Sequence, residues 1–200
     1  MRLLLLLPII CLIPACMSRP TNTQREMSDR SADVSEEPRL LYDFSNPAVA
    51  DHWRVEDDVV MGGRSSGNFR PTEDGHGLFS GEVSLENNGG FSSVQYEMEE
   101  VIDLAGRAAF QIRLKGDGKT YNFRVKKPGV RYAYTAPFTT KGGGDWETVT
   151  IPFDSMYATF RGNRVDVPNY AGEPVSTLRF LIGNKKPQTF MLEVAEIAAL

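Results

Sequence analysis

From Arg39 onward, short runs rich in β-branched and aromatic residues alternate with turn residues, at intervals of about eight to twelve residues. Glycine, proline, asparagine and aspartate mark the turns. In residues 110–115, apolar and polar side chains alternate strictly, as in a strand with one buried face. No segment carries a sustained helical stripe with capping residues. The spacing therefore predicts an all-β domain, either an antiparallel sandwich or a barrel.

The same alternation defines the expected strands. They cover residues 40–44, 52–55, 65–69, 78–85, 92–97, 108–115, 121–126, 131–138, 147–153, 177–182 and 190–197. Residues 115–119, Lys-Gly-Asp-Gly-Lys, predict a hairpin turn, because glycine permits the positive φ that tight turns need. Residues 101–105 predict a single turn of helix.

The N-terminus has the features of an export signal. Arg2 precedes an apolar run over residues 3–13, and about a dozen residues are too few to span roughly 30 Å of hydrocarbon. The run ends in Ile-Pro-Ala-Cys, which resembles the bacterial lipobox, where the cysteine is lipidated and becomes the new N-terminus. We therefore expect a signal peptide over residues 1–15, lipidation of Cys16, a flexible tether over residues 16–38 and one domain over residues 39–200.

The composition limits the chemistry and the partners that we expect for this domain. Cys11 lies in the expected leader and Cys16 would carry lipid, so no cysteine is left for a disulfide, a metal site or a thiol nucleophile. The net charge is −4 and no Lys/Arg cluster is present, which excludes nucleic acid and leaves the lipid anchor as the expected contact with a membrane. Met17 follows Cys16, and in Gram-negative lipoproteins this favours the periplasmic face of the outer membrane.

Tests for catalytic chemistry fail. Ser65 lies in a G-x-S-x-G pattern, but Pro71 follows closely and prevents the helix that a nucleophile elbow requires. His52 and His76 lack metal-ligand spacing. We expect no catalytic residue and no cofactor. The one metal alternative is a structural calcium ion between the first and last strands, by analogy with sandwich domains of the galactose-binding type, which often hold one there. Its candidate ligands are Asp43, Glu193 and Glu196.

Several blocks, in this order along the chain, resemble the complex I intermediate-associated protein 30 family. They are residues 53–67 (WRVEDDVVMGGRSSG), 79–91 (FSGEVSLENNGGF), 115–118 (KGDG) with Tyr121, Trp146 with 151–153 (IPF), 161–162 (RG) and 190–194 (FMLEV). The resemblance covers residues 40–200 and implies a galactose-binding-like jelly-roll β-sandwich. In mitochondria the family is known as an assembly chaperone for respiratory complex I. Complex I assembly on the matrix side is topologically inside, whereas the export signal predicted here places the domain outside the cytoplasmic membrane.

The first block offers two interpretations. Residues 61–63 form a tight connection, in which Asp57 or Asp58 accepts backbone N–H groups. Alternatively, the loop belongs to a ligand site at the rim of the sandwich, where Asp57, Asp58 and Ser65 supply polar groups.

The other candidates carry the same ambiguity between structure and binding. Asn87 and Asn88 either form a turn or bind ligand hydroxyls, and Phe91 either begins a strand or stacks on a sugar. Further rings that belong either to the core or to a binding platform are Trp53, Tyr121, Tyr132, Tyr134, Trp146 and Tyr157. The cations that we would test for partner binding are Arg113 and Arg161.

We therefore expect a non-catalytic binding or assembly-factor domain of an exported, lipid-anchored protein, with a protein or a glycan as partner. A carbohydrate-binding module of the cell envelope is one alternative, and it predicts a concave strand face with exposed aromatic rings. A glycan-active enzyme is a second, and it requires Asp57 or Asp58 near another carboxylate in a pocket. A chaperone-like assembly factor predicts an exposed apolar patch.

Overall fold

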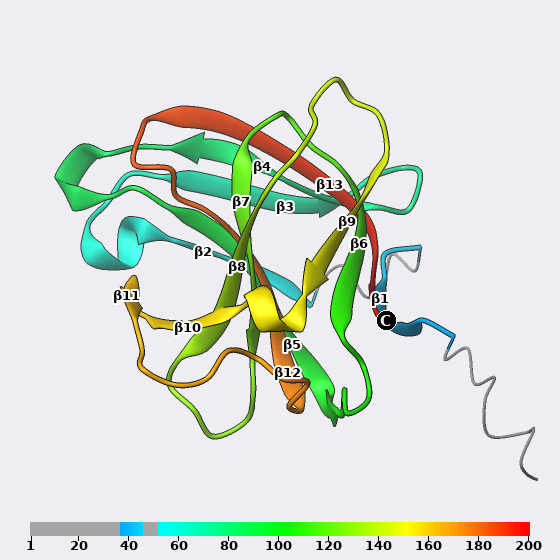
Figure 1. Cartoon of the computed structure of the whole chain (residues 1–200). Helices are drawn as coiled ribbons and strands as arrows, with labels where there is room; N and C mark the ends of the chain where they lie inside the picture. The colour runs from blue at the N-terminus through cyan, green and yellow to red at the C-terminus, as the bar shows by residue number, and fades with distance from the viewer. Residues whose placement is uncertain (1–36, 46–51) are drawn as a thin grey trace, which may run out of the picture. The chain divides into compact units, whose positions relative to one another are not determined.

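The structure is a computed structural model that describes residues 37–45 and 52–200. Two antiparallel sheets pack face to face in the unit that runs from Glu36 to Leu200 (Figure 1). The predicted all-β sandwich is therefore confirmed. Cys16, the expected leader and residues 16–36 of the expected tether lie outside the described residues. Among the helices of the described ranges, none has the length and apolar character needed to cross a membrane.

Six strands form the first sheet, sheet A. They are β1 (Arg39–Asp43), β3 (Ser66–Pro71), β4 (Gly77–Val83), β6 (Ala109–Lys115), β9 (Glu147–Pro152) and β13 (Gln188–Ala199). Their order is β3-β4-β13-β6-β9, and β1 also pairs with β13. The long β13 can pair with both β4 and β1, because β4 pairs with its first half and β1 pairs with its end.

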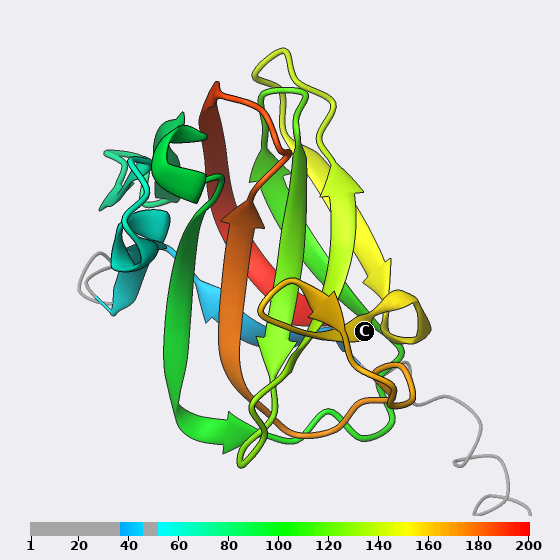
Figure 2. The ribbon, with the colours of Figure 1, turned by 90° about the vertical axis from the view of Figure 1, so that its left-hand side faces the viewer.

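Seven strands form the second sheet, sheet B, which faces the viewer in Figure 2 with the red β13 of sheet A behind it. They are β2 (Trp53–Asp57), β5 (Ser92–Ile102), β7 (Thr120–Lys126), β8 (Ala133–Thr139), β10 (Tyr157–Phe160), β11 (Asn163–Arg164) and β12 (Val175–Ile182). Their order is β11-β10-β8-β7-β12-β5-β2. Three short 3-10 helices connect strands: η1 (Asp58–Met61), η2 (Glu86–Asn88) and η3 (Phe153–Ser155).

The core lies between the sheets because each strand turns alternate side chains inward. In β6, Phe110, Ile112 and Leu114 are fully buried, and in β7, Tyr121 and Phe123 are. The rings of Phe110 and Phe123 meet across the sheets with centroids 5.2 Å apart. The outward positions of the same strands are left polar, and these positions carry the candidate site.

The eleven expected strands are all present, and the structure adds β10 and β11. The helical turn predicted over residues 101–105 is wrong, because Val101 and Ile102 are the last residues of β5. Ile102 pairs with Val175 of β12, and this cross-strand pairing outweighs a weak local preference.

The hairpin predicted at residues 115–119 is also wrong. β6 pairs with β9 and β13 in sheet A, whereas β7 pairs with β8 and β12 in sheet B, so the chain changes sheets at this corner. The Asp117 carboxylate holds the corner, accepting hydrogen bonds from the Tyr121 hydroxyl at 3.1 Å and the Met191 N–H at 2.8 Å. A Cβ at Gly116 would lie 2.2 Å from Thr140, so this close crossing requires glycine.

Candidate functional site

A row of polar side chains crosses the outer face of sheet B. Each member lies directly opposite the next in the register of the sheet, and each points away from the core. We call this set the polar row, and its members, from β2 to β10, are Arg54, Gln95, Arg179, Arg124, Thr135 and Tyr157. Figure 2 shows the strands that carry it side by side. The row presents donors, acceptors and one aromatic ring on a single face.

Arg179, near the middle of the row, is held by several partners. Its Nη2 forms an ion pair with Glu56 Oε2 at 2.5 Å and donates to Gln95 Oε1. Its Nη1 donates to Ser93 Oγ at 3.4 Å. Since both ends of the guanidinium have acceptors and one acceptor is charged, Arg179 is fixed and largely neutralised.

Arg124 lies directly opposite Arg179 and has far less support. Its Nη2 donates to Thr159 Oγ1 at 3.2 Å, and this is its only hydrogen bond to the described part of the chain. Its Nε is buried without a partner there. Burial lowers the pKa of Arg124 and the positive charge of Arg179 lowers it further, whereas Glu56 and Tyr157 raise it by less, and the result is a pKa of about 10. A half-buried cation therefore lies at the centre of the face with one neutral acceptor.

The β8–β10 end of the row combines hydroxyls with an aromatic ring. Thr135 and Thr159 are buried, and their hydroxyl oxygens lie 3.0 Å apart. Tyr157 is half-buried, and the Arg164 guanidinium lies 4.9 Å from the centroid of its ring. The ring is partly exposed and the guanidinium is exposed, both on the outside of the sheet.

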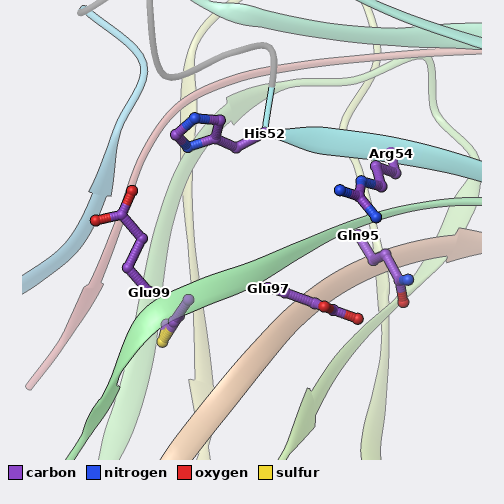
Figure 3. Close-up of a pocket in the computed structure, with 6 residues that line it drawn as sticks. His52, Arg54, Gln95, Glu97 and Glu99 are labelled. Carbon is purple, nitrogen blue, oxygen red and sulfur yellow. The ribbon is translucent and has the colours of Figure 1, made fainter.

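A pocket of about 360 Å³ lies at the opposite end of the row, between β2 and β5. Its lining residues are His52, Arg54, Gln95, Glu97, Met98 and Glu99 (Figure 3). Arg54 and Gln95 belong to both the pocket and the polar row, so the pocket extends the row toward the edge strand. The carboxylates of Glu97 and Glu99 supply hydrogen-bond acceptors.

The predicted residue Asp58 lies elsewhere, fully buried where η1 meets the loop before β5. Its carboxylate accepts four hydrogen bonds: from the Ser65 hydroxyl at 2.5 Å and from the N–H groups of Ser65, Gly90 and Phe91 at 3.0, 2.6 and 3.1 Å. Burial raises the pKa of Asp58, but these hydrogen bonds outweigh it and hold the pKa below its ordinary value. Figure 2 shows the two loops side by side. Both carboxylate oxygens are thus engaged by the chain itself.

The close packing around Asp58 explains why this block is rich in glycine. A Cβ on Gly63 would lie 2.3 Å from Asp58 Oδ1, and one on Gly89 would lie 2.7 Å from Asp58 Oδ2. Asp57 makes a similar tie, accepting from the Gly67 N–H at 2.9 Å and from the Ser92 hydroxyl at 2.5 Å. We call this region, residues 57–67 tied to residues 84–92 through Asp57 and Asp58, the loop junction.

Asn87, Asn88 and Phe91 belong to the loop junction but not to the polar row. Asn87 and Asn88 are exposed and have left-handed φ values of 54° and 62°, so they form the turn around η2. Phe91 is half-buried and precedes β5. The structure thus brings together Asp57, Asp58, Ser65 and Phe91 as turn-forming residues that join two loops.

Most of the other predicted rings are in the core. Trp53, Tyr121 and Tyr134 are buried, and Tyr132 packs against the core beside Tyr134, with ring centroids 5.6 Å apart. Of the six rings, Tyr157 and Trp146 lie half-buried on the outer faces of opposite sheets.

Trp146 forms a cluster with Arg113 on the outside of sheet A. Its ring centroid lies 5.1 Å from the Arg113 guanidinium carbon, 4.3 Å from Lys115 Nζ and 4.6 Å from the centre of the His76 ring. Glu193 accepts from His76 Nδ1 at 2.8 Å and lies 3.5 Å from Lys115 Nζ. The charged and aromatic side chains of this cluster are therefore in contact with one another. Arg161, predicted separately, is exposed, and its guanidinium lies 5.5 Å from the Phe160 ring centroid.

The residues proposed for calcium do not converge. Asp43 lies opposite Glu196 across the β1–β13 pair, but its carboxylate accepts the N–H and hydroxyl of Ser45 at 2.9 and 2.8 Å. Glu193 faces the cations of the Trp146 cluster. Within residues 37–45 and 52–200, no group of three His, Cys, Asp or Glu side chains is arranged to hold a metal ion.

Most residues of the polar row were not predicted from the sequence. Arg124, Arg179, Gln95 and Thr135 occupy the polar positions of alternating strands, and that signal is present in the sequence: Arg124, for instance, lies between the core residues Phe123 and Val125. The sequence does not show the order of the strands. In the structure β7 lies beside β12, and Lys126 and Ser176, which are hydrogen-bonded there, are fifty residues apart in the sequence.

The fold defines the chain as a sandwich similar to carbohydrate-binding modules. It superposes on the family 11 carbohydrate-binding module of the Clostridium thermocellum cellulase Lic26A-Cel5E with a TM-score of 0.60 and 16% identity, over 82% of this chain and 94% of that one. A family 11 carbohydrate-binding module from Clostridium thermocellum in complex with a β-1,3-1,4-mixed-linked tetrasaccharide gives a TM-score of 0.59, at 16% identity over 82% of this chain and 95% of that one.

The sequence itself gives the family. The model of the Complex I intermediate-associated protein 30 family matches residues 42–194, and the chain belongs to this family. Two curated relatives are the mitochondrial proteins of that name from Drosophila melanogaster, 24% identical over 65% of this chain, and Mus musculus, 25% identical over 80%. The chain spans about half the length of these relatives, covering 51% and 56% of them.

Proposed function

We propose that this chain is a non-catalytic binding domain of an exported, lipid-anchored envelope protein, and that it binds a glycan along the polar row. The observation that carries the proposal is the row itself, which places hydrogen-bonding side chains and the Tyr157 ring on one outer face of a rigid sheet. Sugars are recognised by this combination, because hydroxyls pair with polar side chains while the ring face packs on an aromatic.

The fold supports the proposal independently of these residues. Family 11 modules resemble this domain over most of both chains, and one of them has been observed in complex with a tetrasaccharide. The enzyme alternative requires Asp57 or Asp58 to act on a ligand. Asp58 is fully buried and Asp57 ties β3 to β5, so both carboxylates serve the loop junction.

The test is a glycan-binding assay with two matched aromatic variants. Tyr157→Ala removes the ring on sheet B, and Trp146→Ala removes a half-buried ring on sheet A. We expect the wild-type protein to be retarded in gels that contain its polysaccharide, and Tyr157→Ala to weaken binding about tenfold. Trp146→Ala should bind as the wild type does. Equal losses in both variants, or retardation by no polysaccharide in the panel, would contradict the proposal.

A second candidate, a protein partner, has an observation of its own. On the rim of the loop junction, Val59, Met61 and Leu85 are exposed, at 59%, 66% and 41% of their surface. Family membership favours an assembly role, and exposed apolar side chains on well-anchored loops suit protein contacts. Co-purification of a specific protein that is lost in Met61→Ser, with glycan binding absent, would favour this function.

Export and lipid attachment form a separate part of the proposal and have a separate test. Cys16→Ser removes the expected acceptor. We expect the wild-type chain to fractionate with outer membranes and to carry a lipidated N-terminal cysteine by mass spectrometry. The variant should lose both properties. An unmodified Cys16 in the mature wild-type protein would refute the lipid anchor without bearing on the polar row.

A further inference from the structure

The two arginines of the polar row differ in how their charge is balanced. Arg179 has a carboxylate partner in Glu56 at 2.5 Å. Arg124, directly opposite, has only the Thr159 hydroxyl within the described part of the chain, and its Nε is buried without a partner. A half-buried guanidinium is costly to desolvate unless an anion compensates it. The row therefore holds one positive charge in excess at its centre.

The neighbours of Arg124 on the outer face do not supply that anion. Asn122 and Lys126 lie two residues away on the same strand, and Thr135 lies opposite on β8. Thr159 lies opposite Arg164 across β10 and β11. These neighbours are neutral or positive. The Glu56 carboxylate acts on Arg124 only through its charge, and it is already paired with Arg179 at 2.5 Å.

The position of the guanidinium also matters. By bonding to Thr159, Arg124 reaches across β8 to β10. Thr159 and Tyr157 are two residues apart on β10 and share a face, so the guanidinium lies on the same strand surface as the Tyr157 ring. A sugar packed on this ring would bring its substituents to Arg124.

We propose that the ligand of the polar row is an acidic polysaccharide, whose sugars carry carboxylate groups, and that Arg124 binds the carboxylate. This inference rests on the proposed glycan-binding function. A guanidinium presents parallel N–H donors that match the two oxygens of a carboxylate, which makes arginine the preferred residue for such recognition. The bound carboxylate gives Arg124 a negatively charged partner, as Glu56 does for Arg179.

The experiment compares an acidic polymer with its neutral counterpart. Affinity of the purified full chain is measured for polygalacturonate and for the same polymer after reduction of its carboxyl groups to alcohols. We expect the acidic polymer to bind about ten- to a hundredfold more tightly, with an affinity that falls as salt rises. Arg124→Gln should remove this preference, so that the acidic and the reduced polymer bind this variant with similar affinity.

Four controls make the outcome decisive. Arg70→Gln removes an exposed arginine from β3 of sheet A and should keep the full preference, and a thermal melt of each variant checks folding. A sulfated polymer and polyglutamate separate carboxylate-bearing sugars from other anions. Should polyglutamate bind as tightly, or Arg124→Gln keep the preference, the inference would be overturned. Equal binding of the acidic and reduced polymers would also overturn it but leave the glycan-binding function standing, whereas binding of no polysaccharide would overturn both.

Discussion

The loop junction and the polar row each hold a charged side chain away from solvent, but the chain compensates the two charges differently. Asp58 is fully buried and accepts four hydrogen bonds from the protein. Arg124 is half-buried, donates one hydrogen bond to Thr159 and faces a second arginine. The pKa of each group follows: that of Asp58 is lowered, which favours its charge, and that of Arg124 is lowered to about 10, which disfavours its charge.

This difference separates a structural charge from a binding charge. A buried ion whose partners are all intramolecular contributes to folding and has nothing left to offer a ligand. A half-buried ion with too few partners costs stability in the free protein, and a ligand that completes its shell recovers that cost. Mutations in the two regions should therefore have opposite profiles, with a large effect on stability at Asp58 and a large effect on binding at Arg124.

The largest expected effect is that of Asp58→Ala. The substitution leaves three N–H groups and the Ser65 hydroxyl without their acceptor inside the loop junction. We expect the free energy of unfolding to fall by about 3–5 kcal/mol in urea titrations. Asp57→Ala, which removes two hydrogen bonds at a less buried position, should cost about 1–2 kcal/mol. A loss below about 1 kcal/mol for Asp58→Ala would show that the carboxylate does not hold the loops.

The same carboxylate predicts a pH dependence. Because the pKa of Asp58 is lower in the folded protein than its ordinary value of 3.8, the folded state favours the ionised form. Its contribution is complete above the ordinary value and is lost as the pH falls below it, through the folded pKa. In melts between pH 6 and pH 2, Asp58→Asn should show a shallower loss of stability than the wild type. Parallel curves would assign acid unfolding to other carboxylates.

A smaller effect on stability is expected at Arg124. Arg124→Met keeps most of the apolar stem and removes a charge that is poorly compensated. We expect the free energy of unfolding to change by less than about 1 kcal/mol, and to rise if the cost of burying the charge exceeds the value of the Thr159 hydrogen bond. Urea titration measures the change. A loss above about 2 kcal/mol would make Arg124 a structural residue like Asp58 and would remove the contrast between the two regions.

The sequence predicted the layers of the fold well, because the alternation of polar and apolar residues is a local signal. Segments such as Phe110–Leu114 and Phe123–Val125 become strands with one buried face wherever they lie in a sheet. The turn at residues 115–119 illustrates the limit of this signal. Glycine and aspartate permit a hairpin and a crossing between sheets equally well. One of the hydrogen bonds that fix the crossing, from the Met191 N–H to Asp117, joins residues 74 positions apart in the sequence.

The site was harder to predict, for a related reason. Asp57 and Asp58 stand out in the sequence because they are adjacent acids in a glycine-rich segment, yet that prominence reflects the tight packing of the loop junction. The residues of the polar row are inconspicuous one by one. Arg124 and Arg179 become a feature only once β7 and β12 are known to be neighbours, and strand order is a property of the whole fold.

The smallest expected effect tests the exposed rim of the loop junction. Met61 has 66% of its surface exposed and is the last residue of η1. The first residue of η1 is Asp58, whose carboxylate accepts the Ser65 N–H. Since little apolar surface is lost from the core, Met61→Ser should change the free energy of unfolding by less than about 0.5 kcal/mol. Binding to the polysaccharide should also be unchanged, because Met61 is outside the polar row. A marked loss of glycan binding in a fully folded Met61→Ser protein would mean that the ligand extends from sheet B onto the loop junction, and the two regions would then form one binding surface.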